Sequence, residues 1–574
     1  MRREGDETMN EDKKAAIAKL IKVDGVSENE IAELITVPPT RENGDYALPC
    51  FRFAKALRKN PAAIASELAE KITVPQGDII KVEAVNGYLN FFIDRKTATK
   101  NTVEKICREK SEYGSSDEGK GKTVCLDYSS VNIAKPFHIG HLFTTVLGGS
   151  LCKIYDKLGY KSVGINHLGD WGTQFGKLIV AYKKWCSREE LDARGMDALT
   201  EIYVRYHAEA EVHPEMDDEA RAYFKKIEDG DEEATELFRL FKDITLKEVQ
   251  KIYQRLHIRF DSYNGESFYN DKMQPVLDEL ERKGLLVESD GAKIVDLEKY
   301  GMPPCLLVKK DGATLYATRD LAAAYYRKQT YDFYKCLYVV AYQQNLHFRQ
   351  IFKVLELLGK DWAADMVHVA FGMVSLEDGA MSTRKGKVVL LRDVLDRAVE
   401  KSRVLIENKS PNLENKDTVA EQVGVGAVIF YTLYNNRIKD MVFSYDKVLN
   451  FDGETAPYVQ YTNARCISLL EKAGGFDAEK ADFSGLDNPE SEAVASILAG
   501  FGDVLREAVR KYEPCCLARY LVDLCKEYNR FYLAHRISGE EEGVKNARAM
   551  LTAATHYVLE EGLRLLGIDA PQKM

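Results

Sequence analysis

The sequence predicts an α/β protein that joins a doubly wound parallel sheet to a helical carboxyl-terminal part. Residues 124–127 (VCLD) form a short apolar run typical of a buried parallel strand, and apolar residues then recur at helical spacing up to Gly159. From about residue 122 to 410, strand-like and helix-like patterns alternate, as expected of a doubly wound sheet. After Ser410 and Pro411 the patterns are almost wholly helical, which predicts a helical bundle.

Length and composition limit the class of protein. A chain of 574 residues, 45% hydrophobic and 30% charged, predicts several globular domains. Eleven cysteines without a CxxC pair predict neither a disulfide framework nor a zinc ribbon, so no metal site is expected. The formal charge of −10 argues against nonspecific coating of nucleic acid. The chain has neither a signal-peptide pattern nor the roughly 18 consecutive apolar residues of a membrane span, so we expect a cytoplasmic protein without a membrane partner.

We divide the chain into three units. The first, 1–115, combines helical patterns at 13–20 and 62–72 with a hairpin pattern across 82–94. A polar, glycine-rich linker at 111–122 precedes the second unit, 122–410, which an acidic helical insertion interrupts at about 187–256. The third unit, 411–574, is helical.

The segment HIGH, His138 to His141, lies where a helix opens after a predicted strand. Backbone N–H groups and the helix dipole attract phosphate at such a position, so the sequence predicts a nucleotide site there. Strand-like segments at 337–342 and 366–371 are each followed by polar residues. Open sheets bind ligands at the carboxyl ends of their strands, so these residues belong to the same predicted site.

Five motifs together resemble the arginyl-tRNA synthetases of bacterial type, a family of class I aminoacyl-tRNA synthetases. They are HIGH, GDWG at 169–172, YATRD at 316–320, QQNLHF at 343–348 and FGMV…MSTRKG at 371–386. The resemblance covers nearly the whole chain. It implies a Rossmann-like catalytic domain with a helical insertion, a small N-terminal α+β domain that binds the tRNA D-arm, and an all-α anticodon-binding domain.

The resemblance implies an arginine–tRNA ligase. L-Arginine would react with ATP to give arginyl-adenylate and pyrophosphate, and the arginine would then pass to the 3′-terminal adenosine of tRNA-Arg. Members of the family activate arginine only with tRNA bound, and they are expected to be monomers. Mg²⁺ would be held through the ATP phosphates, because the sequence contains no dedicated metal cage.

The chemistry at the α-phosphate depends on positioning and on positive charge or hydrogen-bond donors. The resemblance assigns catalysis to Lys135, His138, Gly140, His141, Met381, Ser382, Arg384 and Lys385. It assigns ATP binding to His138, His141, Gly169, Asp170, Gly172, Phe371, Gly372, Met373 and Val374. The second signature loop departs from the class pattern, because Ala380 and Thr383 replace its two lysines. Lys135 is therefore expected to supply charge to the phosphates.

An arginine substrate requires carboxylates that match its guanidinium. By resemblance, Tyr316, Asp320 and Gln344 hold the guanidinium end, and Ser130, Asn132 and His141 lie near the α-amino and carboxylate end. Asp127 is a further candidate. The alternative for Asp320 is a helix cap before LAAAYYR. Rejection of lysine by unpaired buried carboxylates would make a separate editing domain unnecessary.

The resemblance places tRNA contacts in three parts of the chain. Asn86, Tyr88 and Asn90 match D-arm positions in the N-terminal domain, Tyr458 lies in a loop at about 451–462, and the terminal Met574 belongs to the helical carboxyl-terminal domain. Two alternatives stay open at this stage. One is another class I synthetase, for glutamate, glutamine or cysteine. The other is a tRNA-binding paralogue without catalytic activity.

Overall fold

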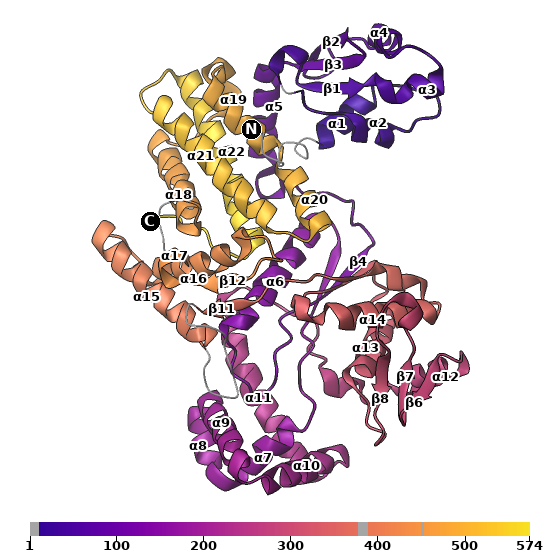
Figure 1. Cartoon of the computed structure of the whole chain (residues 1–574). Helices are drawn as coiled ribbons and strands as arrows, with labels where there is room; N and C mark the ends of the chain where they lie inside the picture. The colour runs from indigo at the N-terminus through magenta and orange to yellow at the C-terminus, as the bar shows by residue number, and fades with distance from the viewer. Residues whose placement is uncertain (1–10, 39, 377–388, 449–452) are drawn as a thin grey trace.

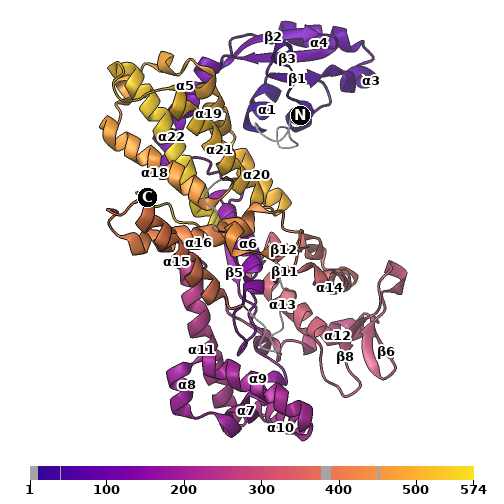
Figure 2. The ribbon, with the colours of Figure 1, turned by 60° about the vertical axis from the view of Figure 1, so that its left-hand side comes forward.

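The protein is described by a computed structural model, which covers residues 11–38, 40–376, 389–448 and 453–574. Figure 1 shows an elongated molecule with the N-terminal unit at one end, a helical insertion at the other, and the parallel sheet between them. The rotated view in Figure 2 shows the same arrangement. Among the described residues, no helix is both long and apolar enough to cross a membrane.

The N-terminal unit is a three-stranded antiparallel sheet covered by helices. Strands β2 (Ile79–Val85) and β3 (Tyr88–Ile93) form the predicted hairpin, and β1 (Tyr46–Pro49) pairs with the other side of β3. Asn86 and Gly87 at the turn have φ values of 50° and 83°, as a two-residue hairpin turn requires. The helices of this unit are α1 (Glu11–Ala18), α2 (Glu28–Leu34), α3 (Ala54–Leu57) and α4 (Pro61–Lys71).

Four parallel strands form the central sheet, which confirms the predicted fold class. Their order is β10 (Met366–His368), β9 (Lys335–Tyr338), β4 (Thr123–Asp127) and β5 (Lys161–Ile165). Asp127 lies opposite both Ile165 and Tyr338, so the carboxyl ends of three strands meet at one edge. The helices that alternate with these strands are α6 (Leu142–Lys157), α13 (Tyr316–Tyr331) and α14 (Asn345–Leu357).

Two insertions separate β5 from β9. The first contains the predicted acidic helices and ends in a long helix that returns to the sheet (Figure 1). Its helices are α7 (Gln174–Trp185), α8 (Arg188–Arg194), α9 (Met196–Val212), α10 (Glu215–Glu228) and α11 (Glu232–Arg255). The second is a small antiparallel sheet with one helix: α12 (Gln274–Arg282), β6 (Leu286–Ser289), β7 (Ala292–Val295) and β8 (Cys305–Val308).

The carboxyl-terminal part is helical, as predicted, with one short strand. Strand β12 (Met441–Phe443) pairs in parallel with β11 (Val374–Leu376), which connects this part to the sheet unit. The remaining elements are α15 (Leu391–Lys409), α16 (Lys416–Tyr434), α17 (Tyr445–Val448), α18 (Ala456–Ala473), α19 (Pro489–Ala499), α20 (Phe501–Lys511), α21 (Cys515–Ala534) and α22 (Glu542–Leu566). Helix α5 (Arg95–Glu109), which leaves the N-terminal unit, packs against α19 and α22.

Candidate active site

The two histidines of HIGH lie in the turn that opens α6. The N–H of Gly140 donates to Nδ1 of His138 at 3.0 Å, and the N–H of His138 donates to Nδ1 of His141 at 3.3 Å. The two ring centroids are 4.1 Å apart. Because each Nδ1 accepts a backbone hydrogen bond, a neutral ring carries its proton on Nε2. Both side chains therefore offer an Nε2–H donor.

Both imidazoles are neutral at pH 7. Burial, with a smaller contribution from the neighbouring charge of Lys135, lowers the pKa of His138 to about 4 and that of His141 to about 3. The histidines can thus donate hydrogen bonds to phosphate oxygens without carrying charge. Lys135, close enough to affect both rings, is the cation of this part of the site.

The loop between β4 and α6 adopts an unusual backbone conformation. Ser129, Ser130 and Ala134 have φ values of 68°, 46° and 58°, in the left-handed region that non-glycine residues rarely occupy. Hydrogen bonds hold this conformation: the N–H of Ser129 donates to Thr144 Oγ1 at 3.0 Å, and the N–H of Ala134 donates to Thr245 Oγ1 at 2.9 Å. The loop is therefore fixed by α6 on one side and α11 on the other.

Asp127 at the end of β4 is already paired within the protein. Arg327 Nη2 donates to its Oδ2 at 2.7 Å, and Ser130 Oγ donates to its Oδ1 at 2.9 Å. Both Asp127 and Arg327 are buried. Two further predicted residues, Asn132 and Gly169, form an isolated parallel β-bridge. A Cβ added to Gly169 would lie 2.4 Å from Asn132 Oδ1. Gly169 is thus needed for the close approach of Asn132.

Asp320 faces the site from the second turn of α13. This helix begins at Tyr316 and has Leu315 at its N-cap, so the helix-cap alternative for Asp320 was wrong. His347 Nε2 lies 2.6 Å from Asp320 Oδ2. Burial opposes ionisation of Asp320, but this hydrogen bond and the charge of His347 hold its pKa below the ordinary value. Asp320 is therefore an ionised carboxylate at the edge of the sheet.

The predicted partners of Asp320 lie at the surface. Tyr316 lies one helical turn before it, on the same face of α13, and is 66% exposed. Gln344 is exposed in the short turn Tyr342–Gln344 that precedes α14. Both side chains are accessible to a small polar ligand.

Sequence reasoning missed Glu266, a second carboxylate of this site. Burial raises the pKa of Glu266 to about 7, Arg319 opposes the rise, and Asp320 adds to it. Glu266 in turn raises the pKa of Tyr316, after the larger effect of burial. Glu266 lies in a short turn, Glu266–Tyr269, and its N–H donates to the carbonyl of Leu168 at 2.9 Å. No local pattern in the sequence connects this turn with GDWG or YATRD.

Asp170 of GDWG lies beneath the surface of the site. It is fully buried and accepts hydrogen bonds from the N–H and Oγ of Ser267, both at 2.8 Å, and from Lys242 Nζ at 2.6 Å. Gly172 has a φ of 130°, which favours glycine. The acidic residue of the motif therefore supports the turn that carries Glu266.

The segment 371–374 crosses the carboxyl edge of the sheet. Phe371 stacks on Phe143 of α6 with ring centroids 5.2 Å apart. A Cβ on Gly372 would lie 2.3 Å from the carbonyl oxygen of Lys439. Met373 is exposed, and Val374 begins β11. The second signature loop, with Met381, Ser382, Arg384 and Lys385, lies outside the described residues.

The predicted tRNA contacts differ in exposure. Asn86 and Tyr88 are exposed at the hairpin turn, and Tyr88 packs edge-on against exposed Phe51 with centroids 5.2 Å apart. Asn90 is only 4% exposed, so its side chain is not accessible at the surface. Tyr458 is partly buried, and its hydroxyl accepts from Asn529 Nδ2 at 3.0 Å. Met574 is also partly buried, against the large apolar core.

An exposed aromatic cluster, also missed, lies beside Tyr458 on α18 and α21. The guanidinium carbon of Arg465 is 4.9 Å from the ring centroids of both Tyr461 and Tyr532. The two tyrosines are 51% and 37% exposed. Exposed rings held by an arginine suit stacking of unpaired bases. The signal in the sequence is the spacing Tyr458, Tyr461, Arg465 along one face of a helix.

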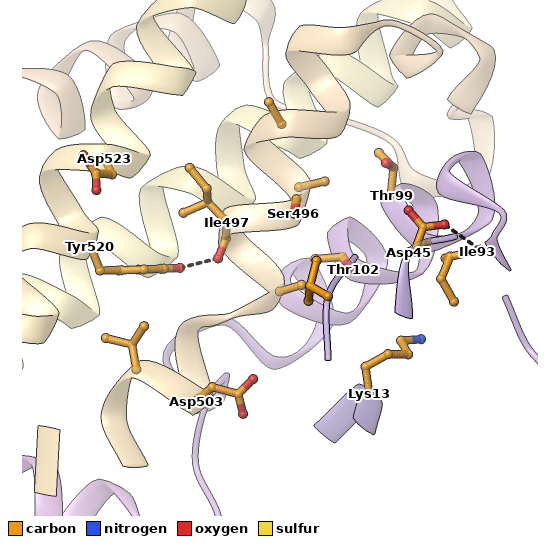
Figure 3. Close-up of a pocket in the computed structure, with 18 of the residues that line it drawn as sticks. Lys13, Asp45, Ile93, Thr99, Thr102, Ser496, Ile497, Asp503, Tyr520 and Asp523 are labelled. Atoms are coloured by element: carbon orange, nitrogen blue, oxygen red, sulfur yellow. Dashed lines mark hydrogen bonds between the residues drawn. The ribbon is translucent and has the colours of Figure 1, made fainter. Parts of the chain in front are cut away.

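A cavity of 1890 Å³ lies away from all of these residues. Residues of the N-terminal unit, of α5 and of α19 to α21 line it (Figure 3). Lys13, Asp45 and Asp503, which line it, carry charges of both signs, so the cavity does not favour one class of ligand. In the described part of the chain, no three His, Cys, Asp or Glu side chains gather as a metal site would require.

The fold and the HIGH turn define a class I aminoacyl-tRNA synthetase. The family model described as tRNA synthetases class I (R), catalytic domain, matches residues 102–445. Models for the arginyl tRNA synthetase N terminal domain and the DALR anticodon binding domain match residues 8–93 and 459–574. The chain belongs to the arginyl-tRNA synthetase family.

Proteins of this family match the chain over nearly its full length. The chain is 53% identical over 566 residues to an arginine–tRNA ligase of Clostridioides difficile, which covers 98% of this chain and 100% of the relative. It is 51% identical to an arginine–tRNA ligase of Alkaliphilus metalliredigens, with coverage of 98% and 100%. The Thermus thermophilus arginyl-tRNA synthetase structure matches with a TM-score of 0.82, 25% identity, and coverage of 98% and 99%. These results exclude the alternative of a synthetase for glutamate, glutamine or cysteine.

Proposed function

We propose that the site activates L-arginine with ATP and transfers it to tRNA-Arg, in line with the arginine–tRNA ligase activity for which its relatives are named. The observation that carries this proposal is the pair of carboxylates, Asp320 and Glu266, beside neutral HIGH donors and the cation Lys135. A guanidinium is the substrate group that matches two adjacent carboxylates.

In the first step, a carboxylate oxygen of arginine attacks the α-phosphorus of ATP. A new O–P bond forms, the bond to the bridging oxygen of the β-phosphate breaks, and pyrophosphate leaves. Mg²⁺ bound through the phosphates would offset the negative charge of the leaving group. The Nε2–H donors of His138 and His141 stabilise the charge that develops on the phosphate. Lys135 adds positive charge from the same loop. In the second step, a hydroxyl of the terminal adenosine attacks the acyl carbon, the acyl C–O bond to the phosphate breaks, and AMP leaves with the hydroxyl proton on a phosphate oxygen.

The arginine side chain enters between α13 and the turn that carries Glu266. Asp320 and Glu266 accept its hydrogen bonds, and exposed Tyr316 covers it from solvent. Asp127 acts indirectly, because both of its oxygens are taken by Arg327 and Ser130. Lysine would leave one carboxylate without its donors, and a buried unpaired acceptor is costly.

The tRNA contacts the N-terminal unit and the carboxyl-terminal helices α18 and α21. The exposed pair Phe51 and Tyr88 and the cluster of Tyr461, Arg465 and Tyr532 both offer rings to unpaired bases. Under this proposal the units 1–115, 122–410 and 411–574 bind the D-arm, carry out catalysis and bind the anticodon, and the protein is a cytoplasmic monomer.

Arginine-dependent exchange of pyrophosphate into ATP tests the proposal. Exchange is expected with arginine and tRNA-Arg together, and not with lysine. It should also be absent without tRNA, as the family resemblance implies. Exchange supported by another amino acid, or no exchange under any of these conditions, would overturn the proposal.

A further inference from the structure

Lys242 is the one side chain of the helical insertion that forms an ion pair with GDWG among the described residues. It lies on α11, the helix that returns from the insertion to the sheet, and its Nζ is 2.6 Å from Asp170 Oδ2. Asp170 is fully buried, whereas Lys242 is partly exposed. A buried carboxylate needs such a partner, because an unpaired charge inside a protein is strongly unfavourable.

The same carboxylate, Asp170, also binds the turn that carries Glu266. Its Oδ1 accepts the N–H of Ser267 at 2.8 Å, and its Oδ2 accepts the Ser267 hydroxyl at 2.8 Å. Gly265 lies so close that an added Cβ would be 2.5 Å from Asp170 Oδ1. The residues on both sides of Glu266 are therefore held against one carboxylate.

We propose that Lys242 is a positioning residue for arginine: through Asp170 and Ser267, it fixes where Glu266 meets the substrate guanidinium. Lys242 itself does not touch substrate. The inference rests on the proposed role of Glu266 in binding arginine. It gives the helical insertion a direct mechanical connection to amino-acid recognition, because α11 also packs against α7, α9 and α10 of that insertion.

The geometry separates arginine binding from ATP binding. Glu266 lies on the turn Glu266–Tyr269 and Asp320 lies on α13, whereas the HIGH histidines lie in the turn that opens α6. A shift of the Glu266 turn should weaken the contact with the guanidinium and leave the phosphate donors in place. Such a shift should therefore raise the KM for arginine and leave the KM for ATP unchanged.

The test measures both KM values by pyrophosphate exchange on the full-length protein with tRNA-Arg present. Lys242→Met should raise the KM for arginine roughly tenfold, since a displaced binding group loses most of its hydrogen-bond energy. Lys242→Arg, which keeps the charge, should recover most of the loss. Ser267→Ala removes one hydrogen bond to Asp170 without burying an unpaired charge, and should raise the same KM by a smaller factor.

Lys251→Met is the matched control. Lys251 lies on the same helix and pairs with Glu248 at 3.1 Å, and Glu248 keeps Arg392 at 3.3 Å after the substitution. Its KM values should equal those of the wild type. Equal rises in the KM for arginine and for ATP would overturn the inference, as would an unchanged KM for arginine in both Lys242→Met and Ser267→Ala.

Glu266→Gln in the same assay separates the inference from the proposed function. If Glu266→Gln raises the KM for arginine and the Lys242 and Ser267 variants do not, only the positioning role is wrong. If Glu266→Gln also has a normal KM for arginine, Glu266 is not a ligand and the inference fails with it. Should Lys242→Met not fold, Ser267→Ala decides the outcome.

Discussion

Arg327 of α13 donates from Nη2 to Oδ2 of Asp127 at 2.7 Å, and both side chains are buried where β4 ends. The guanidinium also lies over the ring of Tyr338, 5.1 Å from its centroid. Asp127, the carboxylate at the end of β4, is thus already paired with an arginine of the protein itself, Arg327. Under the proposed function, Asp320 and Glu266 are the carboxylates that bind substrate arginine, and the Asp127 pair holds the end of the strand that leads into HIGH.

Loss of the Asp127 partner should destabilise the sheet unit. Arg327→Met leaves a buried carboxylate unpaired, and we expect a loss of about 3–5 kcal/mol of unfolding free energy. All three tryptophans, Trp171, Trp185 and Trp362, lie in the sheet unit and its insertions, so urea unfolding followed by tryptophan fluorescence reports on this part.

Arg188→Met is the control for that measurement, because Arg188 pairs with Asp192 on an exposed face of α8. Exposed pairs contribute little, so its unfolding free energy should change by less than about 1 kcal/mol. Equal unfolding midpoints for Arg327→Met and the wild type would show that Asp127 does not depend on this pair.

Asp320 should determine arginine binding and not ATP binding. Asp320→Asn removes the charge but keeps the shape, and the KM for arginine in pyrophosphate exchange should rise roughly 100-fold or more. Asp320→Ala should abolish arginine activation. In both variants ATP affinity should stay nearly normal, because the phosphate donors lie in the turn that opens α6. The control is Asp332→Asn at the exposed end of the same helix, and near-normal arginine activation by Asp320→Ala would exclude the assigned role.

Arginine binding should depend on pH through Glu266. Burial raises the pKa of Glu266 to about 7, so this carboxyl titrates near neutral pH in the free protein. The guanidinium binds the ionised form, so the KM for arginine should fall roughly tenfold from pH 6 to pH 8 and level off above that. Glu266→Gln should remove this dependence while raising the KM. A KM for arginine that is constant over this range, or that rises with pH, would contradict the assignment.

Local patterns were enough to predict the strand β4, the helix α6 and the HIGH turn between them. Apolar spacing and a helix start depend on neighbouring residues, so they can be read from a short segment. The same holds for the hairpin at Asn86 and Gly87, whose turn conformation is a property of two residues.

The contacts of the carboxylates could not be predicted in this way. Glu266 reaches the site only because its turn bonds to Leu168 and Asp170, about one hundred residues earlier. His347 of α14 pairs with Asp320 of α13. Such pairs depend on how helices pack against the sheet, which periodicity does not specify.

The aromatic cluster on α18 and α21 should bind tRNA by stacking. Arg465→Met removes the cation that holds Tyr461 and Tyr532, and the KM for tRNA-Arg in aminoacylation should rise roughly five- to 150-fold, the equivalent of one lost base stack. The KM values for arginine and ATP should not change. Arg530→Met removes the same charge from α21, where Arg530 is exposed and pairs with Glu527. An equal effect of both substitutions would mean that the cluster contributes charge alone, and that its rings do not stack on bases.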